Sequence, residues 1–135
     1  MRNASKVTGM VVGISGLFQI VLGVLFWTGH AAVLVPLHMA VGIVFVLSLW
    51  TIAVLAARAR APMGLVALAF AWGAVVTLLG FTQVQLVPGP QHWIVRVLHL
   101  LVGLGAMGQA SGLARRIGEG AARGPAPAPE ANRAV

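Results

Sequence analysis

Two short stretches, VRVLHLLVG at residues 95–103 and PLHMAVG at residues 36–42, share the core Leu-His-x-x-Val-Gly and indicate how this chain is organised. Each places a histidine, His99 or His38, inside a long run of apolar residues. The first stretch also contains Arg96. A polar side chain within a membrane-spanning run is costly and usually faces a partner or a ligand. Both stretches are therefore candidate functional sites.

The composition predicts a membrane protein. Of the 135 residues, 59% are hydrophobic and 8% are charged, which is far from the range of soluble proteins. Four apolar runs, at residues 7–28, 33–57, 63–87 and 93–114, are each long enough to cross a hydrocarbon core, which needs about 20 helical residues. Because short loops join them, neighbouring helices must be antiparallel. The expected fold class is an all-α transmembrane four-helix bundle.

Basic residues gather on one side of this bundle. They flank the first run, separate the second from the third and follow the fourth: Arg2, Lys6, Arg58, Arg60, Arg115, Arg116 and Arg123. The loops on the other side, around His30 and His92, contain no lysine or arginine. By the positive-inside rule both termini are cytoplasmic and these two histidines lie at the outer face. The formal charge of +7 thus reflects topology, with the lipid bilayer and not nucleic acid as the partner.

The membrane bundle is expected to cover residues 1–117. The first run is longer than the apolar core of a usual signal peptide and lacks a clean cleavage site, so it is predicted to be a retained helix. Residues 118–135, rich in alanine, proline and glycine, are predicted to form a disordered cytoplasmic tail. Frequent alanine, glycine, valine and arginine suggest a multi-pass protein of the inner (plasma) membrane of a bacterium.

The two halves of the chain match one another. A shift of 64 residues aligns the first run with the third, and a shift of 61 aligns the second with the fourth. The aligned pairs are Gly9 with Gly73, Gly16 with Gly80, Gln19 with Gln83, His38 with His99, and Gly42 with Gly103. This pattern predicts two duplicated helical hairpins related by a pseudo-twofold axis along the membrane normal. The second and fourth helices would then be diagonal, with His38 and His99 at similar depth.

These two histidines lie on helix faces that suit a shared ligand. On the fourth run His92, Arg96, His99 and Gly103 recur every three or four residues and form one stripe. Each intramembrane histidine follows its helix start by about five to seven residues, or roughly 8 to 10 Å, which predicts a site in the outer leaflet. Axial ligation of haem iron requires two neutral imidazoles that approach from opposite sides. The pair His38 and His99 is the candidate for that role.

The other two runs carry glycines at related positions, Gly9 and Gly16 on the first and Gly73 and Gly80 on the third. One interpretation is that their missing side chains make room for a broad planar ligand. The other is close helix packing of the small-xxx-small type, which is the commonest use of such spacing in membranes. Both interpretations can hold on one helix.

Arg96 needs a counterion from outside the membrane part of the chain. The only acidic residues are Glu119 and Glu130, both in the predicted tail. One turn outward of His99, Arg96 is placed to pair with a haem propionate, with His92 as a further donor. The alternative is that its side chain extends to a lipid phosphate at the membrane surface.

The four runs resemble the four-helix haem-binding core of the cytochrome b type. In that family, histidines on the second and fourth helices ligate haem b, and glycines on the first and third make space for the macrocycle. By this resemblance His38 and His99 are the haem-iron ligands and Arg96 is a propionate partner. The spacing glycines are Gly9, Gly16, Gly73 and Gly80. Cytochrome b cores often carry a second histidine on each ligand helix, whereas the inner halves of these two runs have none, so one haem is implied.

The function expected from these residues is that of a small b-type cytochrome, an electron carrier or a haem-bearing subunit of a larger membrane complex rather than a stand-alone enzyme. Its partners would be a quinone or a redox protein, and a homo-oligomer is compatible with the sequence. His30 and His92 near the outer loops are candidate proton acceptors for a quinol, with Gln83, Gln85 and Gln91 as hydrogen-bond partners. Ordinary interfacial side chains are the alternative interpretation of these five residues.

Two further function classes remain open. A metal site would have to use histidines from different helices, because His92 and His99 lie about 10.5 Å apart along one helix axis. The absence of intramembrane acidic residues argues against the usual proton- or cation-coupled carriers.

A cofactor-free accessory protein, in which the histidines hydrogen-bond across the axis, is the main competitor. Cysteine chemistry and a Ser-His-Asp triad are excluded, because the chain has no cysteine and no acidic partner within the membrane.

Overall fold

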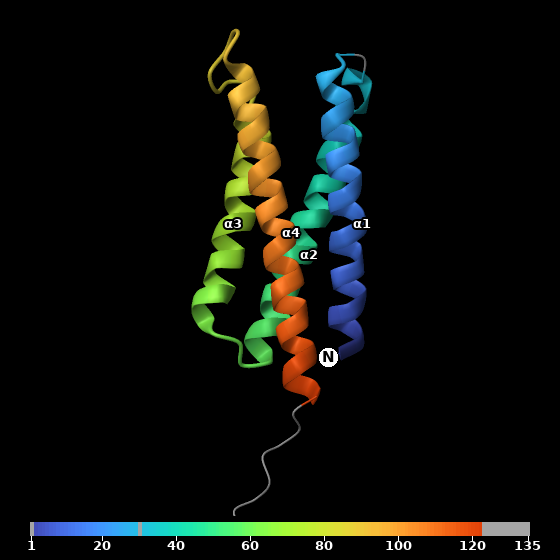
Figure 1. The fold of residues 1–135 in the computed structure, drawn as a ribbon, viewed down its shortest axis with the longest axis vertical. Helices are drawn as coiled ribbons and strands as arrows, with labels where there is room; N and C mark the ends of the chain where they lie inside the picture. The colour runs from blue at the N-terminus through green and yellow to red at the C-terminus, as the bar shows by residue number, and fades with distance from the viewer. Residues whose placement is uncertain (1, 30, 123–135) are drawn as a thin grey trace, which may run out of the picture.

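The computed structural model describes residues 2–29 and 31–122 and consists of four long helices joined by short connections (Figure 1). The elements are α1 (Arg2–Trp27), a 3-10 turn (Ala32–Leu34), α2 (Val35–Arg58), α3 (Met63–Thr82) and α4 (His92–Ala122). Each of the four helices is long and apolar enough to span a membrane. The predicted all-helical, four-helix membrane architecture is thus confirmed for the described part of the chain.

Proline and glycine set the helix boundaries. Gly29 adopts a φ of 77°, a left-handed conformation that a residue without Cβ reaches at no steric cost, just after the end of α1. Pro36 lies in the first turn of α2, where its missing N–H leaves no hydrogen bond unmade, and Pro62 is the N-cap of α3. The helix α3 ends at Thr82, five residues before the end of the predicted run at Val87. Val87 precedes a proline and has a φ of 47°, which is incompatible with a continuing helix.

The fourth helix is longer than its apolar run. It continues to Ala122, so the predicted start of the tail at residue 118 lies inside α4. Glu119 forms an ion pair at 3.7 Å with Arg115 one turn earlier, an arrangement that supports a helix at its exposed end. No proline lies between the start of α4 at His92 and Pro125, so no proline stops the helix at residue 117. The rest of the predicted tail, residues 123–135, lies outside the described residues.

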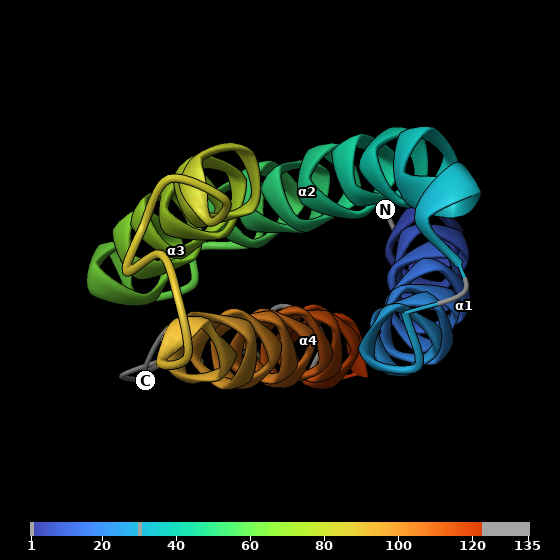
Figure 2. The same ribbon diagram turned by 90° about the horizontal axis from the view of Figure 1, so that it is seen from above.

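The helices α2 and α4 lie on opposite sides of the bundle and nevertheless contact one another (Figure 2). Each of them also contacts α1 and α3, so they form the short diagonal of the bundle. The bundle has two chemically different ends. The arginine end carries the α2–α3 connection, with Arg58 and Arg60, and the histidine end carries the α1–α2 and α3–α4 connections, with His92.

Tight packing is concentrated toward the arginine end. Leu49, Ile52, Ala53 and Ala56 of α2 are fully buried, as are small residues of the other helices such as Ala106. Alanines allow helix backbones to approach closely in a membrane. Toward the histidine end the α1–α2 and α3–α4 hairpins diverge (Figure 1). The bundle is therefore closed at one end and splayed at the other.

Two tryptophans fasten α3 to the helices of the short diagonal. The indole Nε1 of Trp50 on α2 donates to the carbonyl oxygen of Phe70 on α3 at 3.3 Å. The indole Nε1 of Trp72 on α3 donates to the carbonyl oxygen of Val102 on α4 at 2.8 Å. Val102 is three residues from His99, so the second bond fixes α4 close to the histidine.

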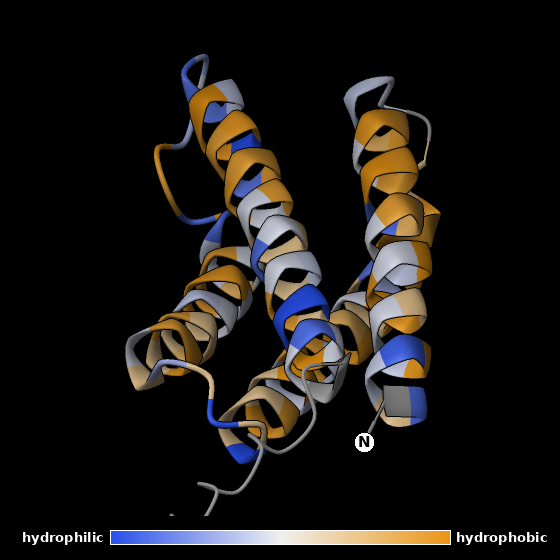
Figure 3. Ribbon diagram, turned by 60° about the horizontal axis from the view of Figure 1, so that its bottom comes forward, coloured by the Kyte–Doolittle hydropathy of each residue, from blue (hydrophilic) through white to orange (hydrophobic). Residues whose placement is uncertain are grey.

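The outward faces of the helices are apolar, as expected for a protein in contact with lipid. Met10 and Ile14 on α1 are each 65% exposed, and Leu78 on α3 is exposed to the same extent. Hydrophobic residues make up most of the four helices, whereas hydrophilic ones gather near the connections and along the last turns of α4 (Figure 3). Such surfaces are stable in lipid and would be aggregation-prone in water.

Candidate functional site

A cavity of about 450 Å³ opens between the two hairpins at the splayed histidine end. All four helices contribute to its walls, and most of the lining residues are apolar. Its polar side chains are those of Gln19, Thr77, Gln83, His38, His92, Arg96 and His99. A concave, largely apolar cavity with a few convergent polar groups is the usual form of a ligand site, and its volume lies within the common range of about 300 to 1,000 Å³.

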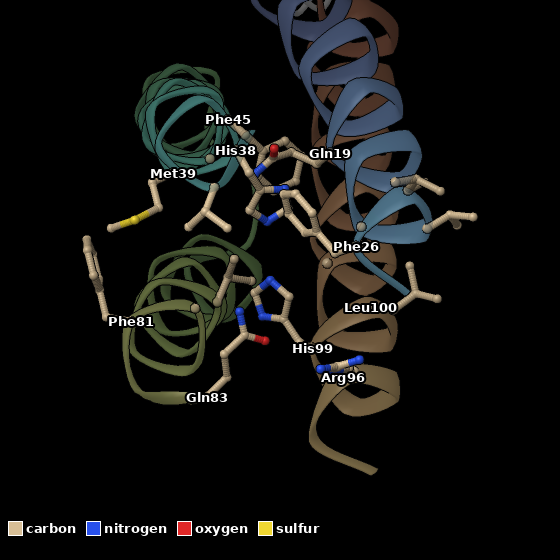
Figure 4. A pocket seen from close by; sticks show the side chains of 18 of the residues that line it. Gln19, Phe26, His38, Met39, Phe45, Phe81, Gln83, Arg96, His99 and Leu100 are labelled. Carbon is tan, nitrogen blue, oxygen red and sulfur yellow. The ribbon is translucent and has the colours of Figure 1, made fainter. Parts of the chain in front are cut away.

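His38 and His99 lie at the centre of this cavity and face one another across it (Figure 4). The centroids of their imidazole rings are 6.3 Å apart and the ring planes are inclined by 52°. Phe26 of α1 meets the ring of His38 edge-on, with a centroid distance of 5.2 Å. The two helices of the short diagonal thus bring together the two histidines that the sequence repeat aligned.

Neither imidazole makes a hydrogen bond with any described residue. The Nδ1 atoms of His38 and His99 are both buried without a partner. A buried polar nitrogen left unpaired costs about 1 to 3 kcal/mol and calls for a specific explanation such as an ion, a water molecule or a ligand. The interpretation in which these histidines only hydrogen-bond across the axis is not supported by this geometry.

The distance between the rings matches the span of two axial ligands on one metal ion. A metal–nitrogen bond is about 2.0 to 2.1 Å long, and the nitrogen lies about 1.1 Å from the centroid of its ring. Two imidazoles bound on opposite sides of one ion therefore have centroids about 6.2 to 6.4 Å apart. The observed centroid separation of 6.3 Å falls in this interval. Direct packing of two imidazoles is compatible with the same separation.

The described residues offer no third protein ligand for an ion at this position. They contain no group of three or more histidine, cysteine or carboxylate side chains that is able to hold a metal. His92, the first residue of α4, lines the same cavity, but its Nδ1 lies 3.2 Å from the carbonyl oxygen of Leu86 in the α3–α4 connection. A four-coordinate zinc site would therefore lack half of its ligands. A metal held in a macrocycle, which brings its own equatorial nitrogens, needs only the axial pair.

The four glycines of the predicted spacing set fall into two groups. Gly16 and Gly80 line the cavity, and a Cβ on Gly80 would lie 3.4 Å from Cε1 of His99. Gly9 and Gly73 do not line it. A Cβ on Gly9 would contact Ala114, and one on Gly73 would collide with the indole of Trp50, so these two glycines serve helix packing. Gly16 belongs to both groups, because it lines the cavity and a Cβ there would lie 2.7 Å from Sδ of Met107 on α4.

Arg96 lies at the mouth of the cavity and has an exposed side chain. It forms no ion pair in the described part of the chain, where the one acidic residue, Glu119, pairs with Arg115 near the arginine end. The cavity therefore has a cationic edge at the histidine end and no acidic side chain in its lining. This is the arrangement expected around a ligand with an apolar body and an anionic edge.

Several lining residues were not predicted as site residues. Gly103 belongs to the predicted histidine stripe, and Gly42 and Gln19 are predicted only as repeat positions, yet all three line the cavity. Their repeated positions were the signal that marks them. Phe26 and Met107 also line the cavity, and nothing in the sequence distinguished them from other apolar residues.

The quinol-binding residues predicted near the outer loops are only partly brought together. Gln83 and His92 line the cavity, whereas Gln85 and Gln91 do not. His30 lies outside the described residues, so its predicted place near the outer surface stays a prediction.

Comparisons of the chain with protein-family models, with characterised proteins and with solved structures gave no match. The chemistry of the cavity is therefore inferred from its own side chains. An apolar cavity with two opposed, unpaired imidazoles and one cationic edge has the groups needed to bind a planar, metal-containing amphiphile.

Proposed function

We propose that this chain is an integral membrane cytochrome of the b type, which holds one haem between α2 and α4 with His38 and His99 as axial ligands. The observation that carries the proposal is the imidazole pair itself, with ring centroids 6.3 Å apart and both Nδ1 atoms buried without a partner. No other pair of described histidines has a ring contact.

The side chains around the imidazoles have separable tasks in this proposal. His38 and His99 hold the metal and orient the ring, while the apolar walls exclude water. Gly80 leaves space beside His99, since even a single Cβ there would touch the imidazole. Arg96 and His92 offer N–H donors to the carboxylates at the edge of the ligand. A haem bound in this way supplies an iron that gains and loses one electron, which is the chemistry of an electron carrier.

A duplicated origin of the two hairpins is part of the proposal and is supported by the cavity lining. Nine pairs of lining residues are separated by 64 positions between α1 and α3 or by 61 positions between α2 and α4, among them Gly16 with Gly80, Gln19 with Gln83, and His38 with His99. A twofold cavity suits a ligand whose metal lies on the axis. Arg96 is an exception, because its counterpart Val35 is apolar. The charge is therefore on one side only.

The orientation in the membrane follows the charge of the connections. We place the arginine end and both termini in the cytoplasm and the histidine end outside, in the inner membrane of a bacterium, because the histidine-end connections contain no lysine or arginine. The haem would then lie in the outer leaflet. Its electron partner would be a quinone or a redox protein, and the chain would act alone, as a homo-oligomer or within a larger complex.

The test of haem binding is a reduced-minus-oxidised visible spectrum of the purified protein, expressed with added haem. We expect the sharp α band of six-coordinate haem b at a stoichiometry near one per chain. His38→Ala and His99→Ala should each abolish the low-spin signal, because each removes one axial ligand. His30→Ala is the control, since it removes a histidine outside the pair and should keep the signal. An unchanged low-spin spectrum in either alanine variant, or a featureless wild-type spectrum from folded protein, would refute the axial pair.

The orientation has its own test, which the absence of native cysteine makes simple. Single cysteines are introduced by Gln91→Cys at the histidine end and by Ala59→Cys at the arginine end. An impermeant maleimide added to intact spheroplasts should label the first variant alone, and both should be labelled after lysis. Labelling of the second variant in intact spheroplasts would reverse the proposed orientation.

A further inference from the structure

Gln19 is a polar residue of the large cavity to which the proposed function gives no task. It belongs to the membrane-spanning part of α1 and lines the cavity on the side of His38 (Figure 4). Its amide oxygen Oε1 is buried without a hydrogen-bond partner. A buried carbonyl oxygen without a donor costs free energy and needs a specific explanation.

The amide of Gln19 lies against α2, close to the face that carries His38. A Cβ on Gly42 would lie 2.7 Å from Nε2 of Gln19, so the amide fills the space that this glycine leaves open. Gly42 follows His38 by four residues and is on the same face of α2. Phe26, about two turns after Gln19 on α1, contacts the ring of His38. This face of α1 therefore packs along the α2 face that bears His38 and Gly42.

The two nitrogens of the His38 ring have different surroundings. Nδ1 is buried without a partner, whereas Nε2 is not fully buried. In the proposed site Nε2 is therefore the nitrogen that holds the iron, which leaves Nδ1–H as a donor inside the protein. A histidine that ligates a metal almost always donates its other ring N–H to a carbonyl, a carboxylate or water. Nδ1 of His38 needs an acceptor, and Oε1 of Gln19 is an acceptor that needs a donor.

We infer that Gln19 is a positioning residue for His38, with its amide oxygen accepting a hydrogen bond from Nδ1–H while Nε2 holds the haem iron. The two atoms do not form this bond in the present structure. The three rotatable bonds of the glutamine side chain allow the amide to turn toward the ring. The bond would fix the tautomer and the orientation of the imidazole and make Nε2 more basic. A more basic ligand favours ferric over ferrous iron, so Gln19 lowers the reduction potential.

The repeat gives Gln83 the corresponding place on α3, but the contact with a glycine is not repeated there. Gln83 is the C-cap of α3. A Cβ on Gly103, the counterpart of Gly42, would meet no other atom within 4 Å. The support is therefore assigned to one axial ligand only, His38. This inference rests on the proposed function of the same cavity, because the bond tunes a metal only if His38 ligates one.

The test is redox potentiometry of the haem-loaded protein, with haem affinity measured on the same samples. Gln19→Leu removes the acceptor and should weaken ferric haem binding about tenfold, within the range for a lost outer-shell partner. Because ferrous binding is less affected, the potential should rise by up to about 59 mV, the equivalent of a factor of ten for one electron. Gln19→Glu keeps an acceptor, so its potential should stay at or below that of wild type.

Gln109→Leu is the matched control for the loss of an amide. Gln109 on α4 also has a buried Oε1 without a partner, but it does not line the cavity. Its replacement should leave both the affinity and the potential unchanged. An equal rise of the potential in the two leucine variants would mean that any loss of a buried amide alters the site, and the inference would be wrong.

Failure of this inference is distinguishable from failure of the haem site. A normal low-spin spectrum in wild type, together with an unchanged potential in Gln19→Leu, would overturn the role of Gln19 and leave the axial pair standing. Wild-type protein without a low-spin spectrum would refute both proposals. If Gln19→Leu does not fold, Gly42→Ala decides, because its Cβ would displace the amide of Gln19 and should also raise the potential. An unchanged potential in that variant would overturn the inference.

Discussion

Gly80 illustrates how a single residue without a side chain shapes the site. A Cβ at this position would lie in contact with the imidazole of His99, so a larger group directed toward the ring would have to displace it. We predict that Gly80→Val lowers the haem content of the purified protein and broadens its low-spin spectrum, whereas Gly80→Ala stays close to wild type. The measurement is haem per chain from the pyridine haemochrome.

Gly64→Val is the control for this substitution. Gly64 is on the same helix and a Cβ there would meet no other atom within 4 Å, so the added bulk projects away from packed neighbours. Equal loss of haem in the two valine variants would mean that helix distortion, and not contact with His99, causes the effect.

Gly73 packs against another helix instead of lining the cavity, although the sequence pattern predicts the same spacing role for Gly73 and Gly80. A Cβ at Gly73 would collide with the indole of Trp50. We predict that Gly73→Ala destabilises the bundle by about 1 to 3 kcal/mol, the usual cost of an overpacked contact, without preventing low-spin haem binding. Unfolding in mixed micelles measures the loss of stability, and the visible spectrum measures whether low-spin haem is still bound. Normal stability combined with loss of haem would place Gly73 at the site.

Residue types in the sequence were sufficient to select His38 and His99 as the pair that the bundle brings together. Histidines inside apolar runs are rare, and these two recur in the same local pattern. They were not sufficient to separate the pocket glycines from the packing glycines. That distinction depends on which side chain of another helix lies opposite, and spacing along one helix does not contain it.

At the level of helices, the hydrogen bond from Trp72 to the carbonyl oxygen of Val102 fixes the position of α3 against α4, three residues after His99. We predict that Trp72→Phe, which keeps an aromatic ring but removes the donor, lowers stability by about 0.6 kcal/mol, the average for interhelical hydrogen bonds in membranes. Because α4 then loses its fixed register near His99, the reduction potential of the bound haem should also shift.

Trp93→Phe is the control for the Trp72 substitution. Trp93 is 61% exposed and its indole donates no hydrogen bond to a described residue. The Trp93→Phe variant should therefore have the same free energy of unfolding and the same haem reduction potential as wild type. A change of stability without a change of potential in Trp72→Phe would mean that the tryptophan supports the fold and does not position the histidine.

The ends of the helices show where sequence patterns predict elements well and where they do not. The third apolar run begins at Met63, and α3 begins at the same residue, with Pro62 as its N-cap. Its end was placed five residues too late, since Gln83 to Val87 remain apolar enough to prolong the run although the backbone turns before Pro88. The continuation of α4 to Ala122 was missed because polar and glycine residues ended the apolar pattern. Hydropathy reports the membrane boundary, and a helix extends beyond it wherever its backbone bonds continue.

For the whole molecule, the splayed histidine end leaves a cavity between the two hairpins, which the proposed haem would bridge. We predict that haem stabilises the bundle, by about 2.7 kcal/mol at a free concentration of one hundred times its Kd. The measurement is the midpoint of unfolding with and without added haem. The double variant His38→Ala and His99→Ala should show no such rise. An equal rise in that variant would mean that haem binds elsewhere or only partitions into the micelle.

The sequence by itself determined the class of this protein, the number of its membrane helices and the pair of histidines that the second and fourth helices carry. These are local properties, since an apolar run of about 20 residues has to span and to satisfy its own backbone hydrogen bonds in lipid. Only the tertiary structure decided that the bundle closes around Leu49 and Ile52 and opens at His38 and His99. It also decided that Gly73 faces a tryptophan while Gly80 faces a histidine. Both outcomes depend on the shapes of side chains from different helices, and close packing between helices is not encoded in the periodicity of any one of them.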